Sequence, residues 1–426
     1  MKLPYADVEF DKKGATVDPA QVEAVDDLLT QKHPTDVLVV THGWNNTEGQ
    51  ARALYERLVD SIVAVRPRVS GASKRTFVVV GVLWPSIQWA PDEESGAGAG
   101  LGDERAALEA DIAERIENPT TRKKLLALVP RLETSSEAQE EFLALLRKTL
   151  PRSSKGEDDA AFTALKKASA QEVLDAARTS GQTDDAAPAL GGAAGIDPAG
   201  LPPLADDIEG GGAGFFDSIV DAARNLVNVT TYYTMKERAG VVGKKGIAPL
   251  LDHIHTSAPA ARVHLIGHSF GGRAVTAAAL AAKAPISSLS LLQAAYSHFG
   301  LAEDWDGAGR NGLFTKVPAK VDGPIIVTFT RNDKAVGLAY PIASRLAQQI
   351  GVSLGDENDP YGGIGRNGAL KTPGAVGAKL LDVGGTYSFT GHEVWSLNGD
   401  AFITGHSDIT GRQVGYAVLS AVLAAQ

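Results

Sequence analysis

The segment Gly267-His268-Ser269-Phe270-Gly271 places a serine between two glycines, each two positions away. An apolar run at 263–266 precedes it and an alanine-rich run at 274–282 follows, which predicts a strand, a sharp turn and a helix. Only small residues fit two positions before and after a serine on such a turn. The pattern predicts that Ser269 is a nucleophile, and an ordinary glycine-serine turn is the alternative interpretation.

A serine hydroxyl needs a base to accept its proton, and a carboxylate usually orients that base. We therefore expect an acid and a histidine after Ser269, at the same edge of the sheet. Asp333 is the predicted acid because it follows the apolar run 325–329, although a turn or helix-capping aspartate is the other interpretation. Three rival aspartates are weaker because none directly follows a predicted strand: Asp304, Asp306 and Asp322.

The chain has nine histidines, of which two are candidates for the base. His406 is preferred because it ends a predicted strand at 400–404 and precedes the last predicted helix at 413–424. The interval from Asp333 to His406 is long and glycine-rich, which keeps His392 as an alternative. The other seven lie in helices or strands, precede the acid, or belong to turn motifs: His33, His42, His253, His255, His264, His268 and His298.

These residues need a scaffold, which short apolar runs supply. Strands are predicted at 37–40, 77–84, 263–266, 289–294, 325–329 and 400–404, with an edge strand at 8–10. Helical patterns alternate with them, among them 48–65 and 413–424. Continuous apolar runs suit strands covered on both faces, so we predict an α/β protein with a mainly parallel sheet and helices on both faces.

Residues 91–236 interrupt this alternation. Apolar residues between 103 and 178 recur at helical spacing, and the segments 91–102 and 184–214 have the glycine-rich composition of flexible linkers. We expect a core formed by 1–90 and 237–426, with an α-helical insertion at 91–236. A lid over the active site is one interpretation of this insertion, and a passive or oligomerisation element is the other.

Four motifs follow predicted strands in the order of one known superfamily. They are Thr41-His42-Gly43-Trp44, the segment around Ser269, Arg331-Asn332-Asp333-Lys334-Ala335-Val336 and Gly405-His406-Ser407-Asp408-Ile409. The chain resembles the α/β-hydrolase superfamily, in its lipase- and esterase-like part, over residues 37–84 and 237–426. The resemblance implies the α/β-hydrolase fold and a catalytic triad of Ser269, Asp333 and His406.

Acyl transfer also places negative charge on the carbonyl oxygen of the substrate, which backbone N–H groups stabilise. The resemblance implies that the N–H groups of Trp44 and Phe270 form this oxyanion hole. Gly43 would let the chain turn inward and His42 would brace the turn, whereas a plain strand-to-helix turn is the alternative interpretation.

Side chains after the predicted strands indicate what the site binds. We place His42, Gly43, Trp84 and Tyr296 in the predicted substrate-binding set. Aromatic residues there favour a small-molecule or polymeric ester with an apolar acyl or aryl group. For Trp84, a position in the core is an equally good interpretation.

Composition excludes several other classes of site. Because the chain has no cysteine, it has no disulfide, thiolate nucleophile or cysteine-ligated zinc. No phosphate-binding or dinucleotide-binding glycine motif joins a strand to a helix, and His392-Glu393 has no second histidine in zinc-binding register. We therefore predict no metal and no organic cofactor. A net charge of −10 argues against binding to nucleic acid.

The expected activity is hydrolysis of carboxylic esters through an acyl-enzyme intermediate. An amidase or peptidase with the same triad is one alternative, and a non-catalytic binding or effector protein of the same fold is another. No apolar run could span a bilayer and no apolar leader follows Met1, so we expect a cytoplasmic protein without an integral membrane segment. Export without an N-terminal signal is left open, and the sequence indicates no oligomeric state.

Overall fold

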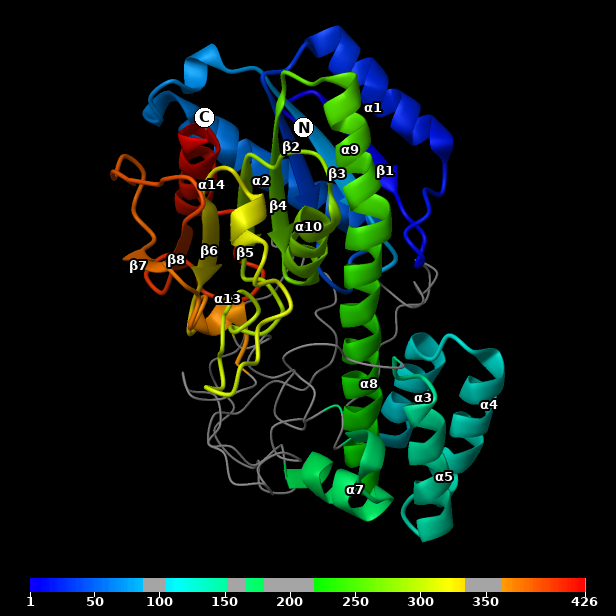
Figure 1. Cartoon of the computed structure of the whole chain (residues 1–426). Helices are drawn as coiled ribbons and strands as arrows, with labels where there is room; N and C mark the ends of the chain where they lie inside the picture. The colour runs from blue at the N-terminus through cyan, green and yellow to red at the C-terminus, as the bar shows by residue number, and fades with distance from the viewer. Residues whose placement is uncertain (87–103, 152–161, 163–164, 180–217, 334–361, 426) are drawn as a thin grey trace, which may run out of the picture.

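The structure is a computed structural model that describes residues 1–86, 104–151, 162, 165–179, 218–333 and 362–425. One sheet of eight parallel strands forms its centre, in the order β1-β3-β2-β4-β5-β6-β8-β7 (Figure 1). The strands are β1 (Tyr5–Glu9), β2 (Asp36–Thr41), β3 (Phe77–Leu83), β4 (Arg262–His268), β5 (Ser288–Leu292), β6 (Ile325–Phe329), β7 (Val376–Lys379) and β8 (Val394–Asn398). The predicted α/β class with a parallel sheet is confirmed.

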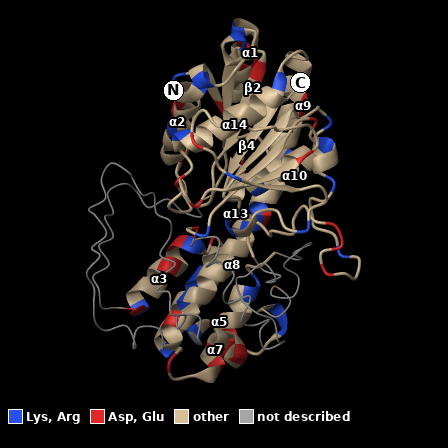
Figure 2. Ribbon diagram, turned by 90° about the vertical axis from the view of Figure 1, so that its left-hand side faces the viewer, with Lys and Arg blue, Asp and Glu red and all other residues tan. Residues whose placement is uncertain are grey.

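Helices cover both faces of this sheet. One face is covered by α2 (Glu48–Val65) and α14 (Arg412–Ala424), and the other by α1 (Pro19–Lys32), α9 (Ala248–Ser257) and α10 (Phe270–Ala281). The strands are almost entirely tan in Figure 2, because most of the charged residues lie on the helices and loops. Burial on both faces explains the continuous apolar runs of the strands. Shorter elements lie at Arg66–Arg68, Ala72–Lys74, Val129–Arg131, Pro318–Lys320 and, as α13, at Ile364–Asn367.

Five of the six predicted strands and the edge strand are confirmed to within a few residues, but the strand predicted at 400–404 is wrong. The chain leaves the sheet at Asn398, and the N–H of Asp400 donates to Oδ1 of Asn398 at 2.9 Å. The turn chemistry of Asn398-Gly399-Asp400 therefore outweighs the apolar run that follows it. His406 consequently lies on the loop between β8 and α14, not at the end of a strand.

A group of helices extends away from the sheet along the long helix α8 (Ile219–Val242). The group consists of α3 (Glu104–Arg115), α4 (Pro119–Leu128), α5 (Ser136–Arg147) and α7 (Ala170–Thr179), packed around the half of α8 that lies far from the sheet (Figure 1). Polar contacts also fasten α3 to α8, since Arg224 donates to Asp111 at 2.6 Å and Arg115 donates to Asn228.

Helix α8 continues without a break through residues 236 and 237, where the sequence analysis placed the boundary between insertion and core. A π-helical segment, Gly243–Ile247, then joins α8 to α9. The predicted linkers at 91–102 and 184–214 lie outside the described residues. Among the helices that are described, none combines the length and the apolar character that a membrane crossing requires.

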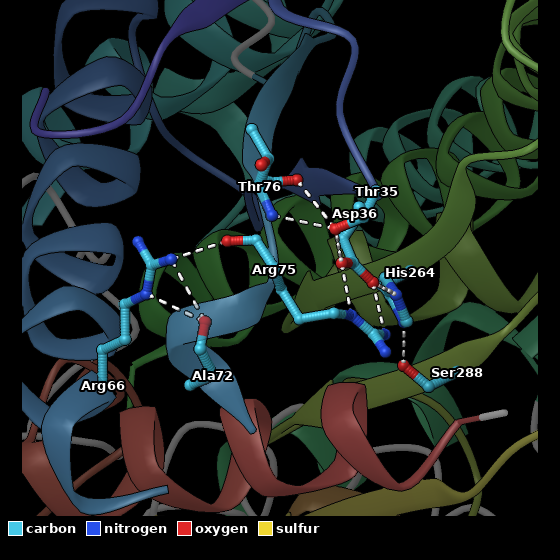
Figure 3. A network of polar contacts seen from close by, with 8 residues as sticks. All are labelled: Thr35, Asp36, Arg66, Ala72, Arg75, Thr76, His264 and Ser288. Atoms are coloured by element: carbon cyan, nitrogen blue, oxygen red, sulfur yellow. Dashed lines mark hydrogen bonds and ion pairs between the residues drawn. The ribbon is translucent and has the colours of Figure 1, made fainter. Parts of the chain in front are cut away.

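A buried polar network joins neighbouring strands at their amino ends (Figure 3). Asp36 in β2 accepts two hydrogen bonds of 2.7 Å from Arg75 and one of 2.9 Å from Nε2 of His264 in β4. Nδ1 of His264 lies 2.8 Å from Oγ of Ser288 in β5. Burial alone would raise the pKa of Asp36, but hydrogen bonds from His264, Arg75 and Thr35 outweigh it and lower that pKa. The network helps to hold β2, β4 and β5 in register. Because these strands are parallel, their carboxyl ends lie at the same edge of the sheet.

Candidate active site

The carboxyl ends of β2 and β4 lie side by side where the strand order reverses. From β2 the chain continues to β3 on one side, whereas from β4 it continues to β5 on the other side. Thr41 and Gly267 form the last pair in the register of β2 with β4. The loops after the two strands therefore diverge, which is the position where open parallel sheets bind ligands.

Three side chains from distant parts of the sequence form a continuous hydrogen-bonded group at this edge. Ser269 follows β4, Asp333 follows β6 and His406 lies between β8 and α14. Nε2 of His406 lies 2.8 Å from Oγ of Ser269, and Nδ1 of His406 lies 2.8 Å from Oδ2 of Asp333. Because a carboxylate only accepts, Nδ1–H donates to Asp333 and Nε2 accepts the hydroxyl of Ser269. The arrangement can move a proton away from this serine.

Exposure separates this group from the network at the amino ends of the strands. Asp36, His264 and Ser288 have the same three residue types and similar distances, but all three are 0% exposed. In contrast, Ser269 is 6% exposed and the side chain of His406 is 15% exposed. Of the two groups, only the one at the carboxyl ends has a serine and a histidine that are partly exposed.

The backbone of Ser269 is strained, as expected for a nucleophile on a sharp turn. Its φ is 56° and its ψ is −125°, a region that residues with a side chain rarely occupy. A Cβ on Gly267 would lie 2.5 Å from the carbonyl oxygen of Gly271, and one on Gly271 would lie 2.3 Å from that of Thr41. The close packing therefore requires both glycines. The N–H of Ser269 donates to the carbonyl of Leu292 at 3.2 Å and helps to hold this conformation.

Two backbone N–H groups flank the serine. Phe270 begins α10, where the N–H groups of the first turn have no acceptor within the helix. Trp44 follows Gly43, which approaches the nucleophile so closely that a Cβ there would lie 2.6 Å from the Cβ of Ser269. Within the described residues, neither the N–H of Phe270 nor that of Trp44 donates to an acceptor. Both can therefore stabilise an oxyanion, and the helix dipole adds to the effect at Phe270.

His42 braces the loop that carries these residues. Its Nδ1–H donates to the carbonyl of Gly43 at 2.8 Å, and its Nε2 accepts the N–H of Trp84 at 3.2 Å. The indole of Trp84 stacks on the imidazole with 5.5 Å between ring centroids and donates to the carbonyl of His42 at 3.0 Å. Both ring nitrogens of His42 are used in hydrogen bonds to the main chain, one to Gly43 and one to Trp84, so neither is left for a substrate.

Burial lowers the pKa of His42 to about 4, against the opposing effect of its hydrogen bond to Gly43. The unfolded chain binds a proton at this residue near pH 6.5, so unfolding takes up a proton between pH 6.5 and 4. We expect the free energy of unfolding to fall across this range as the pH decreases, by about 3 kcal/mol from His42 alone. Burial also lowers the pKa of His264 and of His268, which adds to the slope.

Urea unfolding at pH 4, 5 and 7 measures this dependence. The variant His42→Gln keeps a polar side chain but cannot titrate, so its stability should depend less on pH than that of the wild type. An equally steep profile in both proteins would contradict the assignment of a neutral, buried His42.

The rival candidates lie away from the serine. His392 is exposed and precedes β8, and its N–H donates to the carbonyl of Gly323, so it lies at the amino end of the sheet. Asp322 also lies at that end and is exposed, whereas Asp304 and Asp306 accept hydrogen bonds within their own turn. The structure therefore brings neither the alternative base nor the alternative acids to the nucleophile elbow, the sharp turn at residues 267–271 between β4 and α10.

The aromatic side chains near the site differ in exposure. Trp84 and Tyr296 are 3% and 0% exposed, so the structure gives them a packing role and their contact with substrate stays a prediction. Trp44 is partly exposed, and its ring lies 6.2 Å from that of Phe270. Tyr232 on α8 lies 5.1 Å from the same ring, which brings the long helix next to the elbow.

Residues that the sequence analysis missed hold the acid and base loops together. Oδ1 of Asp400 accepts hydrogen bonds from Oγ1 of Thr330 at 2.9 Å and from the N–H of Arg331 at 2.8 Å. Asp400 lies on the loop that carries His406, whereas Thr330 and Arg331 precede Asp333. The turn sequence Asn398-Gly399-Asp400 could have indicated these contacts, but residues 400–404 were predicted as a strand.

Among the described residues, no group of three or more histidine, aspartate or glutamate side chains could hold a metal ion. A scan against protein-family models, a search of curated proteins and a search of solved structures each found no match to this chain. The function is therefore inferred from the geometry of the site.

Proposed function

We propose that this protein is a serine hydrolase that cleaves carboxylic esters through an acyl-enzyme intermediate, on an α/β-hydrolase fold. The observation that carries the proposal is the hydrogen-bonded group of Ser269, His406 and Asp333, with 2.8 Å at each step. The order of these residues in the chain and the position of the serine between a strand and a helix support the superfamily assignment. The N–H groups of Trp44 and Phe270 support acyl transfer.

In the first half of the reaction, Oγ of Ser269 attacks the ester carbonyl carbon while Nε2 of His406 accepts the hydroxyl proton. Asp333 holds the imidazole through Nδ1–H and stabilises the imidazolium that forms. Negative charge develops on the carbonyl oxygen, where the N–H groups of Trp44 and Phe270 stabilise it. His406 then donates its proton to the departing alkoxide, which leaves as the alcohol.

In the second half, water attacks the acyl-enzyme while His406 accepts one of its protons. Collapse of the tetrahedral intermediate breaks the bond to Oγ and releases the carboxylic acid. His406 returns the proton to Ser269, which restores the starting state. The partly exposed indole of Trp44 supports an apolar acyl or aryl group in the substrate. Helix α8 connects the helices packed on its far half to the site, because its Tyr232 contacts Phe270, and the lid role that we propose for these helices depends on this connection.

A fluorophosphonate probe and a panel of p-nitrophenyl esters and matched anilides test the proposal. We expect the probe to form one covalent adduct, which peptide mass spectrometry assigns to Ser269, and esters to be hydrolysed faster than anilides. Failure of the wild type both to react with the probe and to hydrolyse any ester would overturn the proposal. Faster cleavage of anilides would instead favour an amidase.

A further inference from the structure

A second histidine contacts the proposed base from the residue that precedes the nucleophile. Nε2 of His268 lies 2.9 Å from the backbone carbonyl oxygen of His406, and the two imidazole rings are 4.9 Å apart with a 42° tilt. A carbonyl oxygen only accepts, so Nε2 of His268 carries the proton and donates it. The elbow therefore touches the loop of the base twice, through the hydroxyl of Ser269 and through the imidazole of His268.

The surroundings of His268 favour the same tautomer. His268 is 7% exposed, and its Nδ1 is buried without a hydrogen-bond partner in the described part of the chain. A Cβ on Gly43 would lie 3.3 Å from this nitrogen, so Nδ1 faces the loop of the oxyanion donors. A proton on Nδ1 would be a buried donor without an acceptor, which is costly. Burial, followed by the neighbouring His406 and His42, lowers the pKa of His268 to about 3, against its hydrogen bond to the His406 carbonyl.

We propose that His268 is a positioning residue, which holds the main chain of His406 so that Nε2 of His406 stays within hydrogen-bond distance of Ser269. The inference deepens the proposed function and rests on it. The relay hydrogen bond alone fixes one atom of the His406 ring, because the ring can still pivot about Oγ of Ser269. The bond from His268 to the main chain adds a second point, and the bond to Asp333 adds a third.

The position of His406 depends on such contacts because its loop has little regular structure. The loop between β8 and α14 is held internally by Asp408, which accepts from the N–H of Thr404 at 3.0 Å and from its hydroxyl at 2.9 Å. Asp400 ties the start of the loop to the acid loop. The bond from His268 ties the middle of it to the nucleophile elbow. Displacement of a reacting group by about 1 Å costs roughly 100-fold in rate, so this contact has a measurable effect.

Two substitutions of His268 distinguish the effect of its N–H donor from the effect of its ring. His268→Phe keeps an aromatic ring but has no donor, whereas His268→Gln keeps an N–H at nearly the distance of Nε2 from the main chain. We expect kcat for a p-nitrophenyl ester to fall by about 10- to 100-fold in H268F with KM nearly unchanged, and the rate of fluorophosphonate labelling to fall in parallel. H268Q should recover most of both rates.

His253→Phe is the matched control. His253 lies on α9 and pairs with Asp26 at 2.9 Å, so loss of an imidazole there should leave kcat unchanged. Unfolding in urea shows whether each variant is folded, and ¹⁵N NMR of the histidines reads the protonated nitrogen of His268 directly. We expect a neutral ring protonated at Nε2 from pH 5 to 8.

The outcomes distinguish this inference from the proposed function. Lower kcat and slower labelling in H268F, with most of both rates recovered in H268Q, support the positioning role. If the wild type reacts with the probe and a folded H268F reacts at the same rate, or if Nδ1 of His268 carries the proton, the positioning role is overturned while the proposed function stands. If the wild type neither reacts nor hydrolyses esters, the proposed function fails and the positioning role fails with it.

Discussion

Replacement of Ser269 by alanine is expected to lower kcat for an activated ester by about 10⁴- to 10⁶-fold. The substitution removes Oγ, which is the proposed attacking atom, and leaves the bond between His406 and Asp333 in place. The oxyanion donors also stay, so the variant should still bind substrate and retain weak catalysis above the rate in water. Labelling by a fluorophosphonate should disappear completely.

Stability measurements show whether the loss is chemical. Alanine has the same Cβ as serine and meets the same backbone strain at φ 56°, so we expect the free energy of unfolding to change by no more than about 1 kcal/mol. Ser407→Ala is a matched control, because Ser407 is exposed on the loop of the base and follows a similar Gly-His pair. Retention of more than a tenth of the wild-type activity in S269A, or loss of labelling in S407A, would contradict the assignment.

The nucleophile turn could be predicted from the sequence because its constraints are local. Gly267 and Gly271 are required by contacts within the turn and with the adjacent β2, and the apolar run before Ser269 is long enough to indicate a strand. Likewise, β6 and the helix α2 have the predicted bounds, since each is a strongly patterned segment with clear ends. The position of Asp333 at this edge of the sheet could be predicted because it is an acid a few residues after a buried apolar run.

Features that depend on distant partners could not be predicted. The sequence does not show that Asp400 accepts hydrogen bonds from the acid loop, so the segment around it resembled a strand. The edge strand β7 is short and half-exposed, which leaves no clear apolar pattern. The bond from His268 to His406 joins residues 138 positions apart, and nothing near either residue indicates the other. Motifs identify the groups that react, whereas the packing of loops decides what holds them.

Substitution of Asp333 is expected to have the second large effect on kcat. Asp333→Asn is expected to lower kcat by about 10⁴-fold while the protein stays folded. The asparagine side chain fits the same space, but its amide N–H₂ can donate to Nδ1 of His406. The imidazole then carries its proton on Nε2 and donates to Ser269 where it must accept. The variant therefore keeps Ser269, His406 and a side chain of similar shape at position 333, but loses the direction of proton transfer.

Measurements of kcat and KM, together with ¹⁵N NMR of His406, test this explanation. We expect KM to change little and the proton of His406 to move from Nδ1 to Nε2. Asp322→Asn is the control, because Asp322 is exposed at the amino end of β6 and was a rival acid in the sequence. A tenfold or smaller loss in D333N, or an equal loss in D322N, would refute the role of Asp333.

The double variant S269A/D333N gives the strictest test, because residues that act as one unit lose activity together. Once Oγ is absent, the direction of proton transfer through His406 no longer matters, so the second substitution should cost little beyond the first. Independent roles would instead multiply the two losses to about 10⁸-fold or more. The double variant would then be less active than the oxyanion hole and substrate binding alone should make it. A product of the two single losses would mean that Asp333 stabilises the site by a route that does not pass through His406.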